Sequence, residues 1–176
     1  YVGELGWEFY CPMEYGLRLW DTLWEAGTPE GMVAGGYKAI DSLRLEKAYR
    51  YWSGEISPDY TPYEAGLGFA VNLDKEDFIG KEALVKQKAE GVTRKLCTMT
   101  LADDRTIVMG KEPIRVDGKT VGWVASGGFG YSVAKSIAYA YLPLEYSKPG
   151  TKLEIECFGE QVGAELVGGR AVGGGH

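Results

Sequence analysis

Histidine is almost missing from this chain of 176 residues, whose single histidine is His176 at the last position. A Ser-His-Asp triad, a histidine-ligated zinc site and most histidine general-base schemes all need that side chain. Any chemistry must therefore rely on carboxylates, arginine, lysine, tyrosine or a bound cofactor.

Cysteine is also scarce. Cys11, Cys97 and Cys157 lie far apart and form no C-x-x-C pair. An odd and scattered set of cysteines argues for a reducing compartment and against a disulfide framework. We therefore expect a cytoplasmic protein, or a protein of the mitochondrial matrix if the source is eukaryotic.

Long apolar runs and basic runs are missing as well. No stretch of about 18 apolar residues occurs, so we expect no membrane partner. The net charge is −6, and a sequence-independent grip on nucleic acid needs a basic face, so we expect no nucleic-acid partner either. The residues that are present, 45% apolar and 25% charged, are typical of a globular chain with one large or two small domains.

Up to Gly91 the pattern predicts helices joined by irregular segments. Apolar residues recur at helical spacing over residues 15–26, 36–46 and 80–90. In the second of these helices we expect Ile40 and Leu43 to face inward. The segment 61–73 begins with a proline turn and predicts a glycine-rich apolar strand.

After Gly91 the sequence predicts short strands separated by turn residues. The pair Asp117-Gly118 is a preferred two-residue hairpin turn. Strands are expected over residues 95–101, 113–116, 119–124, 136–142, 152–158 and 161–167. The predicted fold class is therefore α+β, with an α+β domain over residues 1–91 followed by a small antiparallel β-barrel over residues 92–168. Residues 169–176 are interpreted as a flexible tail or a cloning remnant.

Glu4 is the first candidate ligand-binding residue, because it lies between glycines in Gly3-Glu4-Leu5-Gly6. Glycines let a backbone approach a ligand closely, and a carboxylate held there can accept two parallel hydrogen bonds. A flat heterocycle with adjacent ring N–H and amino donors, such as a pterin or a guanine, presents that pattern. A glutamate exposed in a turn fits the same spacing, so the residues alone leave both interpretations open.

Arg44 is the second candidate. It can pair with Asp41 one turn earlier on the same helix, and such a surface pair contributes only a few tenths of a kcal/mol. Alternatively, its forked guanidinium can bind the carboxylate of a ligand through two hydrogen bonds.

Two further patterns have a structural interpretation by default. The segment around Gly127 and Gly128 lacks the spacing of a dinucleotide or phosphate-binding loop, so we expect a tight connection between barrel strands there. Four aromatic residues can stack against a planar ligand, although packing in a core is their usual role. They are Tyr49, Tyr51, Trp52 and Tyr60.

Five sequence blocks occur in a fixed order along the chain. They are Tyr1-Val2-Gly3-Glu4-Leu5-Gly6-Trp7-Glu8, Ala39-Ile40-Asp41-Ser42-Leu43-Arg44-Leu45-Glu46, Thr61-Pro62-Tyr63-Glu64-Ala65-Gly66-Leu67-Gly68, Asp77-Phe78-Ile79-Gly80-Lys81-Glu82-Ala83-Leu84 and Ser126-Gly127-Gly128. In this order they resemble the folate-binding aminomethyltransferase family, which includes the T-protein of the glycine cleavage system. Several ordered blocks are far more specific than any one of them.

Residues 126–143 resemble one branch of that family, the C-terminal region of dimethylglycine and sarcosine dehydrogenase-like flavoproteins. The resemblance implies a tetrahydrofolate cofactor and transfer of a one-carbon unit to it. It also implies FAD in another part of a parent protein. The chain would then be the C-terminal half of the folate-binding unit, inactive alone and able to form a homo-oligomer through its exposed cut face.

Carried over from the family, Glu4 matches the glutamate that hydrogen-bonds the pterin ring, and Arg44 matches the arginine near the bound folate. The family's catalytic aspartate has no counterpart here, so no catalytic residue is expected in this chain. An alternative is a non-catalytic folate-binding or assembly module on the same scaffold. The K-G-C-Y-x-G-Q-E signature of that branch is absent from this sequence, which disfavours it.

Overall fold

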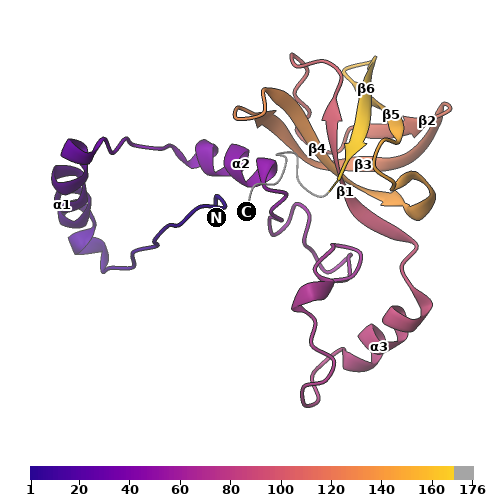
Figure 1. The fold of residues 1–176 in the computed structure, drawn as a ribbon, viewed down its shortest axis with the longest axis horizontal. Coiled ribbons are helices and arrows are strands. Elements are labelled where there is room, and N and C mark those ends of the chain that lie inside the picture. Colours follow the sequence, from indigo (N-terminus) through magenta and orange to yellow (C-terminus); the bar gives the residue numbers. More distant parts are fainter. Residues whose placement is uncertain (169–176) are drawn as a thin grey trace.

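A closed barrel of six antiparallel strands forms the best-packed part of the computed structural model, which describes residues 1–168 (Figure 1). Around the barrel the strands follow the order β1-β4-β3-β2-β5-β6. Their bounds are β1 Arg94–Leu101, β2 Pro113–Val116, β3 Lys119–Gly130, β4 Lys135–Pro143, β5 Lys152–Cys157 and β6 Glu160–Val167. The antiparallel barrel and all six predicted strands are thereby confirmed. The interpretation of residues 169–176 lies outside the described residues.

The barrel follows from alternation along the strands and from its turns. Asp117 and Gly118 both have positive φ, 49° and 74°, which suits the tight turn that joins β2 to β3. Strand β4 is buried along most of its length, between β1 and β3. The core inside the barrel is formed by fully buried apolar side chains that include Met99, Ile114, Ala138, Leu142 and Ile155.

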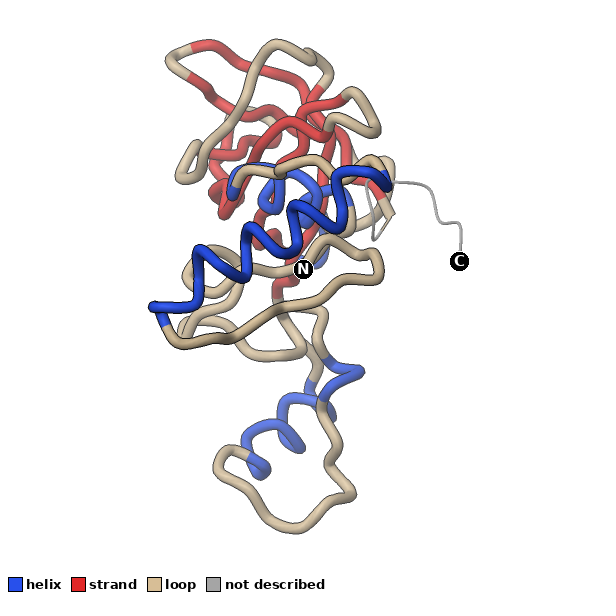
Figure 2. Tube along the Cα trace, turned by 90° about the vertical axis from the view of Figure 1, so that its left-hand side faces the viewer, coloured by secondary structure: helices blue, strands red, loops and turns tan. Residues whose placement is uncertain are grey.

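Three α-helices precede the barrel in sequence. They are α1 Gly16–Gly27, α2 Tyr37–Glu46 and α3 Lys81–Glu90, close to the helices that the periodicity predicts. Helix α2 lies against the barrel, where the Ser42 hydroxyl donates a hydrogen bond of 2.7 Å to the Phe129 carbonyl of β3 (Figure 1). Figure 2 looks from the side of α1, with α3 at the bottom of the view and the strands at the top.

The predicted inner face of α2 is wrong. Ile40 and Leu43 are 43% and 39% exposed, whereas Arg44 and Leu45 are buried. The last turn of α2 carries the contact with the barrel, because the hydroxyl of Tyr139 on β4 donates a hydrogen bond to the Leu45 carbonyl. Leu45 packs there against Ile137 and Tyr139, while the buried Arg44 belongs to a polar network that is described below.

The strand predicted for residues 61–73 is also wrong. The Glu64 carboxylate accepts a hydrogen bond from the Thr61 amide, while the Thr61 hydroxyl accepts one from the Glu64 amide, and this reciprocal cap closes a turn. Only a 3₁₀-helix, Gly68–Ala70, follows it. Gly127 and Gly128 lie within β3 instead of connecting two strands, so that prediction is wrong too.

Helix α1 has no buried residue and ends in a further 3₁₀ turn, Thr28–Glu30, at the left-handed Gly31. Its apolar side chains remain open, with Trp20 and Trp24 stacked at a ring distance of 5.7 Å. Within residues 1–168, no helix is both long and apolar enough to cross a membrane.

Candidate functional site

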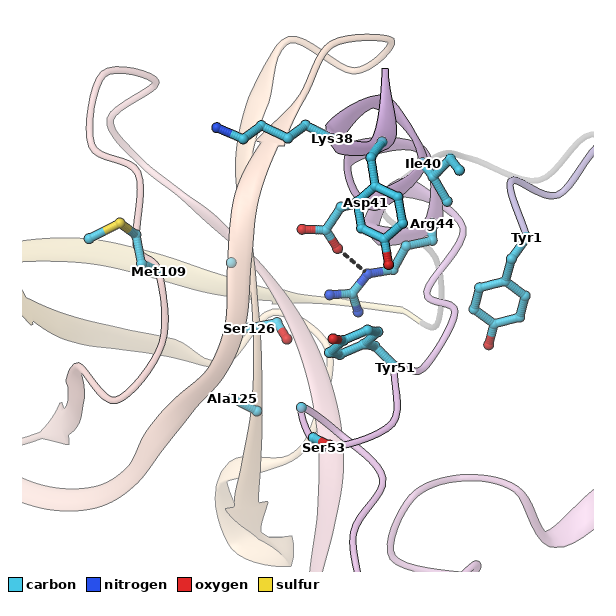
Figure 3. Close-up of a pocket in the computed structure, with 13 residues that line it drawn as sticks. Tyr1, Lys38, Ile40, Asp41, Arg44, Tyr51, Ser53, Met109, Ala125 and Ser126 are labelled. Carbon is cyan, nitrogen blue, oxygen red and sulfur yellow. Dashed lines mark hydrogen bonds and ion pairs between the residues drawn. The ribbon is translucent and has the colours of Figure 1, made fainter. Parts of the chain in front are cut away.

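The cavity that adjoins Arg44, called the principal cavity below, lies between α2, the turn that follows it and strand β3 (Figure 3). Its volume is about 600 Å³, within the range usual for small-molecule sites. Tyr37 and Tyr51 provide aromatic surface, and Arg44, Ser53 and Ser126 provide polar groups. The arrangement suits a flat ligand that carries a few hydrogen-bonding atoms.

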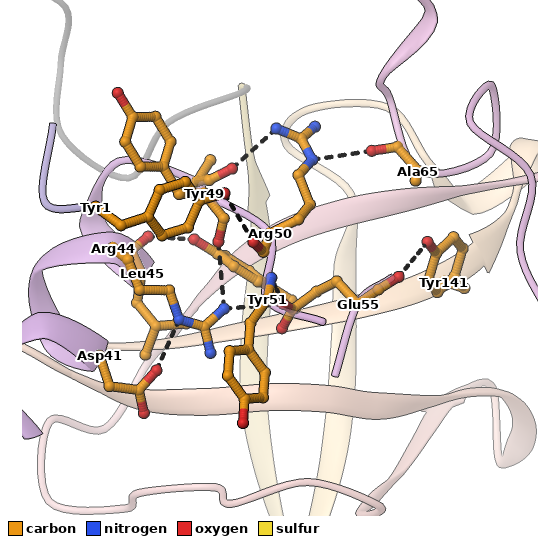
Figure 4. Close-up of polar contacts among 12 residues, drawn as sticks. Tyr1, Asp41, Arg44, Leu45, Tyr49, Arg50, Tyr51, Glu55, Ala65 and Tyr141 are labelled. Atoms are coloured by element: carbon orange, nitrogen blue, oxygen red, sulfur yellow. Dashed lines mark hydrogen bonds and ion pairs between the residues drawn. The ribbon is translucent and has the colours of Figure 1, made fainter. Parts of the chain in front are cut away.

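Arg44 is buried at the wall of this cavity and belongs to an ionic network (Figure 4). Its Nε donates to Asp41 Oδ1 over 2.7 Å, and its Nη1 donates to Glu55 Oε2 over 2.9 Å and to the Tyr49 carbonyl over 3.2 Å. Burial alone would lower the pKa of the guanidinium, but the charge of Glu55 and the hydrogen bond to Asp41 raise it. Arg44 therefore stays charged, and the pairing with Asp41 that the sequence offered is present.

One nitrogen of the Arg44 fork remains unused. Among residues 1–168, Nη2 has no hydrogen-bond partner, whereas Nε has one and Nη1 has two. A bidentate grip on a ligand carboxylate needs two free nitrogens on one edge of the guanidinium. In this arrangement Arg44 can offer a ligand one free nitrogen only, Nη2.

Glu4 lies outside the principal cavity. Its side chain is 73% exposed, and its Oε1 accepts a hydrogen bond of 3.2 Å from Lys47 Nζ. The left-handed Gly3 allows this approach, because a Cβ there would lie only 2.7 Å from Lys47 Cγ. The structure thus does not bring Glu4 and Arg44 into one cavity, although Lys47 follows directly on α2.

Tyr1 connects the surroundings of the two candidates. It lines the principal cavity and also a smaller one of about 440 Å³, to which Lys47, Tyr49 and Phe69 contribute. The rings of Tyr1 and Tyr49 lie 4.9 Å apart, and the Tyr1 hydroxyl donates to the Arg50 carbonyl. Glu4 lines neither cavity, and only its partner Lys47 lines the smaller one.

Glu55 is the site residue that the sequence reasoning missed. It is fully buried and belongs to the turn after α2, where its Oε2 also accepts a 2.7 Å hydrogen bond from the Tyr51 amide. The available signal was one carboxylate in Tyr51-Trp52-Ser53-Gly54-Glu55-Ile56, a segment otherwise free of charge. A lone charge in such a segment is buried only when it is paired.

The aromatic residues of the irregular segment take different roles. Tyr51 lines the cavity, Trp52 is exposed, and Tyr60 stacks on Tyr141 of β4 at a ring distance of 3.6 Å. Within the described part of the chain, no cluster of three or more histidine, cysteine, aspartate or glutamate side chains could hold a metal ion.

Two family models match the chain. The model described as "GCVT N-terminal domain" matches residues 1–75, and the model described as "Glycine cleavage T-protein C-terminal barrel domain" matches residues 94–171. The second match includes all six strands of the barrel.

Several curated proteins are similar to it. The chain is 44% identical over 168 residues to the mitochondrial dimethylglycine dehydrogenase of Homo sapiens, and the matched region is 95% of this chain and 19% of that protein. It is 41% identical over 167 residues to an aminomethyltransferase of Desulfitobacterium hafniense, covering 95% and 46%. A mitochondrial sarcosine dehydrogenase of Mus musculus is 43% identical over 143 residues, covering 81% and 16%. The chain thus spans less than half the length of these relatives.

A solved structure has the same fold. It is the glycine cleavage system aminomethyltransferase T of Bartonella henselae, with a TM-score of 0.80 and 27% sequence identity over 88% of this chain and 43% of that one. Sequence blocks, family models and fold agree from the helices to the barrel. This chain therefore belongs to the glycine cleavage T-protein (aminomethyltransferase) family.

Proposed function

We propose that this chain is a tetrahydrofolate-binding part of an aminomethyltransferase or of a dimethylglycine or sarcosine dehydrogenase-like protein. The observation that carries the proposal is the pair of cavities on either side of Tyr1, one lined by Arg44 and the other by the Lys47 that holds Glu4. Membership of the family supplies the ligand class. A parent protein with a FAD-bearing part, in the cytoplasm or the mitochondrial matrix, belongs to the same proposal.

The donor set suits a reduced folate. A pterin is flat and carries ring nitrogens, an amino group and a carbonyl oxygen, and tyrosine rings offer apolar faces for such a ring. Tyr37 and Tyr51 supply these faces, while Arg44 and the Ser126 hydroxyl supply polar groups at the cavity wall. When bound, tetrahydrofolate supplies nitrogen atoms that accept a one-carbon unit.

The role of the chain's own residues is to bind and orient. Holding a reactant in place can contribute several kcal/mol toward a transfer reaction. Glu4 lines neither cavity in the free chain, and we propose that its side chain leaves Lys47 on binding and accepts hydrogen bonds from the adjacent N–H and amino donors of the pterin. Its exposed pair with Lys47 contributes at most about 1 kcal/mol, so a ligand can displace Lys47 at little cost.

Calorimetric titration of tetrahydrofolate into the full chain tests this function. We expect a saturable heat with the wild type and a loss of at least tenfold in affinity for Glu4→Ala. Glu14→Ala is the matched control, because Glu14 is an exposed glutamate of the same N-terminal region. Absence of any heat with the wild type, or equal affinity of Glu4→Ala and the wild type, would contradict the proposal.

We also infer that the chain self-associates through the exposed apolar side chains of α1. Leu17, Trp20 and Trp24 lie on a helix whose side chains touch little besides its flanking turns. Apolar patches of this kind mark interaction surfaces. A second copy of the chain presents the same helix and can cover the patch symmetrically.

A further inference from the structure

Glu55 is a fully buried carboxylate at the centre of the network that holds Arg44 (Figure 4). Its Oε2 accepts hydrogen bonds from Arg44 Nη1 and from the Tyr51 amide. Its Oε1 has no partner among residues 1–168. A buried charge is expensive unless it is paired, so the position of this carboxylate depends on Arg44.

The backbone fixes where the Glu55 carboxylate lies. The turn closes through hydrogen bonds from the Glu55 and Ile56 amides to the Tyr51 carbonyl, both 3.1 Å long. The Tyr141 hydroxyl of β4 donates over 2.7 Å to the Glu55 carbonyl. The barrel thus holds the turn, the turn holds the carboxylate, and the carboxylate holds one side of the guanidinium.

The charges around Arg44 indicate what kind of ligand group its free Nη2 can bind. The guanidinium carries one positive charge, while Asp41 and Glu55 carry two negative charges within hydrogen-bond distance of it. The exposed Lys38 lines the same cavity and brings the local sum close to zero. A ligand carboxylate therefore gains little attraction here, whereas an uncharged carbonyl oxygen can accept a hydrogen bond from Nη2 without adding negative charge.

We propose that Glu55 is a positioning residue that fixes the Arg44 guanidinium with Nη2 toward the cavity, where it donates to the uncharged carbonyl oxygen of the pterin ring. The inference deepens the proposed folate site and rests on it for the identity of the ligand. The alternative for Glu55 is a purely structural role in pairing a buried arginine.

Two fragments of the folate molecule separate the carbonyl of the pterin ring from the carboxylates. 6-Methyltetrahydropterin has the ring carbonyl and no carboxylate, and p-aminobenzoylglutamate has carboxylates and an amide carbonyl but no ring carbonyl. For Glu55→Gln we expect the affinity for 6-methyltetrahydropterin to fall about tenfold or more, the range of a lost charged hydrogen bond. The affinity for p-aminobenzoylglutamate should stay unchanged or rise, because a negative charge has been removed.

Glu64→Gln is the matched control. Glu64 is also a buried glutamate that pairs with an arginine, Arg94, but neither residue lines the principal cavity. Both variants lose an ion pair, and only Glu55→Gln should weaken binding of the pterin. Equal affinities of Glu55→Gln and the wild type, or equal losses in the two variants, would overturn the positioning role.

Nitrogen NMR of the arginine side chains tests the positioning without any ligand. In the wild type the two Nη signals of Arg44 should be resolved because Glu55 restrains rotation, and they should merge in Glu55→Gln. If the wild type binds no pterin, the proposed function fails, and unchanged Arg44 signals in Glu55→Gln would separately refute the role of Glu55. If Glu55→Gln does not fold, the wild type alone tests the proposal. In the wild type, 6-methyltetrahydropterin should shift the Arg44 signals and p-aminobenzoylglutamate should leave them unchanged. The reverse result would refute the proposal.

Discussion

Cys97 shows how burial changes the chemistry of a single side chain. It lies on β1 inside the barrel, and burial raises the pKa of its thiol to about 11. Cys11 is exposed. Because the thiolate is the reactive form, we expect iodoacetamide at pH 8 to modify Cys11 rapidly and to spare Cys97 in the folded chain. Mass spectrometry of the peptides measures the labelling of each cysteine. Equal labelling of Cys11 and Cys97 in the folded chain would contradict the prediction.

The Tyr141 hydroxyl offers a second prediction for a single residue. Tyr141→Phe removes the donor to the buried Glu55 carbonyl, and an unsatisfied buried acceptor costs about 1–3 kcal/mol. We expect the free energy of unfolding in urea to fall by that amount. Tyr146→Phe is the control, since Tyr146 is a partly buried tyrosine that packs against the barrel core and its hydroxyl makes no hydrogen bond within residues 1–168. A Tyr141→Phe variant as stable as the control would be inconsistent with this bond.

For individual residues, the sequence identified Arg44 and Asp41 of the ionic network but not Glu55. Arg44 was identified through its block, and its pairing with Asp41 followed from helical spacing. Glu55 lies eleven residues later and meets Arg44 only because the chain reverses and is held by β4. The partner of Glu4, Lys47, is likewise 43 residues distant in sequence. No local pattern encodes such contacts, since they depend on the tertiary fold.

The turn at residues 61–64 is tied to β1 by an ion pair that should respond to pH. Burial alone would raise the pKa of the Glu64 carboxyl, but hydrogen bonds from Thr61 and Arg94 outweigh it and lower the pKa below its usual 4.5. The ion pair therefore stabilises the fold fully above about pH 5, and this contribution is lost as the pH falls through the folded pKa. The stability difference between the wild type and Glu64→Gln, followed by urea unfolding from pH 7 to pH 3, should shrink on acidification. A constant difference would refute the coupling.

Strand β3 passes so close to the loop between β1 and β2 that a glycine is required at position 127. A Cβ at Gly127 would lie 2.5 Å from both the carbonyl oxygen and a methyl group of Val108, which is fully buried. Overpacking of this kind costs about 1–3 kcal/mol, and we expect that loss of unfolding free energy for Gly127→Ala. Gly16→Ala on α1 is the control, because nothing lies within 4 Å of its Cβ position. Thermal unfolding compares the two variants, and equal midpoints would contradict the clash.

Elements with a strong period were predictable, and elements governed by contacts were not. The six strands and three helices follow from alternation, helical spacing and turn residues. The strand expected over residues 61–73 failed because Thr61 and Glu64 cap a turn with their side chains. The inner face of α2 failed because Leu45, and not Ile40 or Leu43, packs against Ile137 and Tyr139 of the barrel. The neighbouring Arg44 is buried by its pair with Glu55, which hydrophobic spacing cannot indicate.

For the whole molecule, the proposed self-association through α1 can be tested by placing charge on the exposed apolar face of that helix. The double variant Trp20→Glu/Trp24→Glu should lower the weight-average mass in sedimentation, because it places charge on the apolar patch, where Trp20 is 55% exposed. Arg18→Glu changes the net charge by the same two units on the same helix and serves as the control. A wild type that stays monomeric at all concentrations, or a control that dissociates equally, would contradict self-association through this helix.

The hydrogen bonds from α2 and its following turn to the barrel have a consequence for how the chain opens. Ser42, Leu45 and Glu55 are each bonded to β3 or β4, although they precede the first strand by about forty to fifty residues. Backbone groups that share such bonds exchange their amide protons together. Amides that take up deuterium slowly should therefore occur near the end of α2, be absent from the connection that follows, and occur again from β1 onward. The cooperative unit is discontinuous in sequence, and severing the gene between helices and barrel would remove part of the barrel's own support.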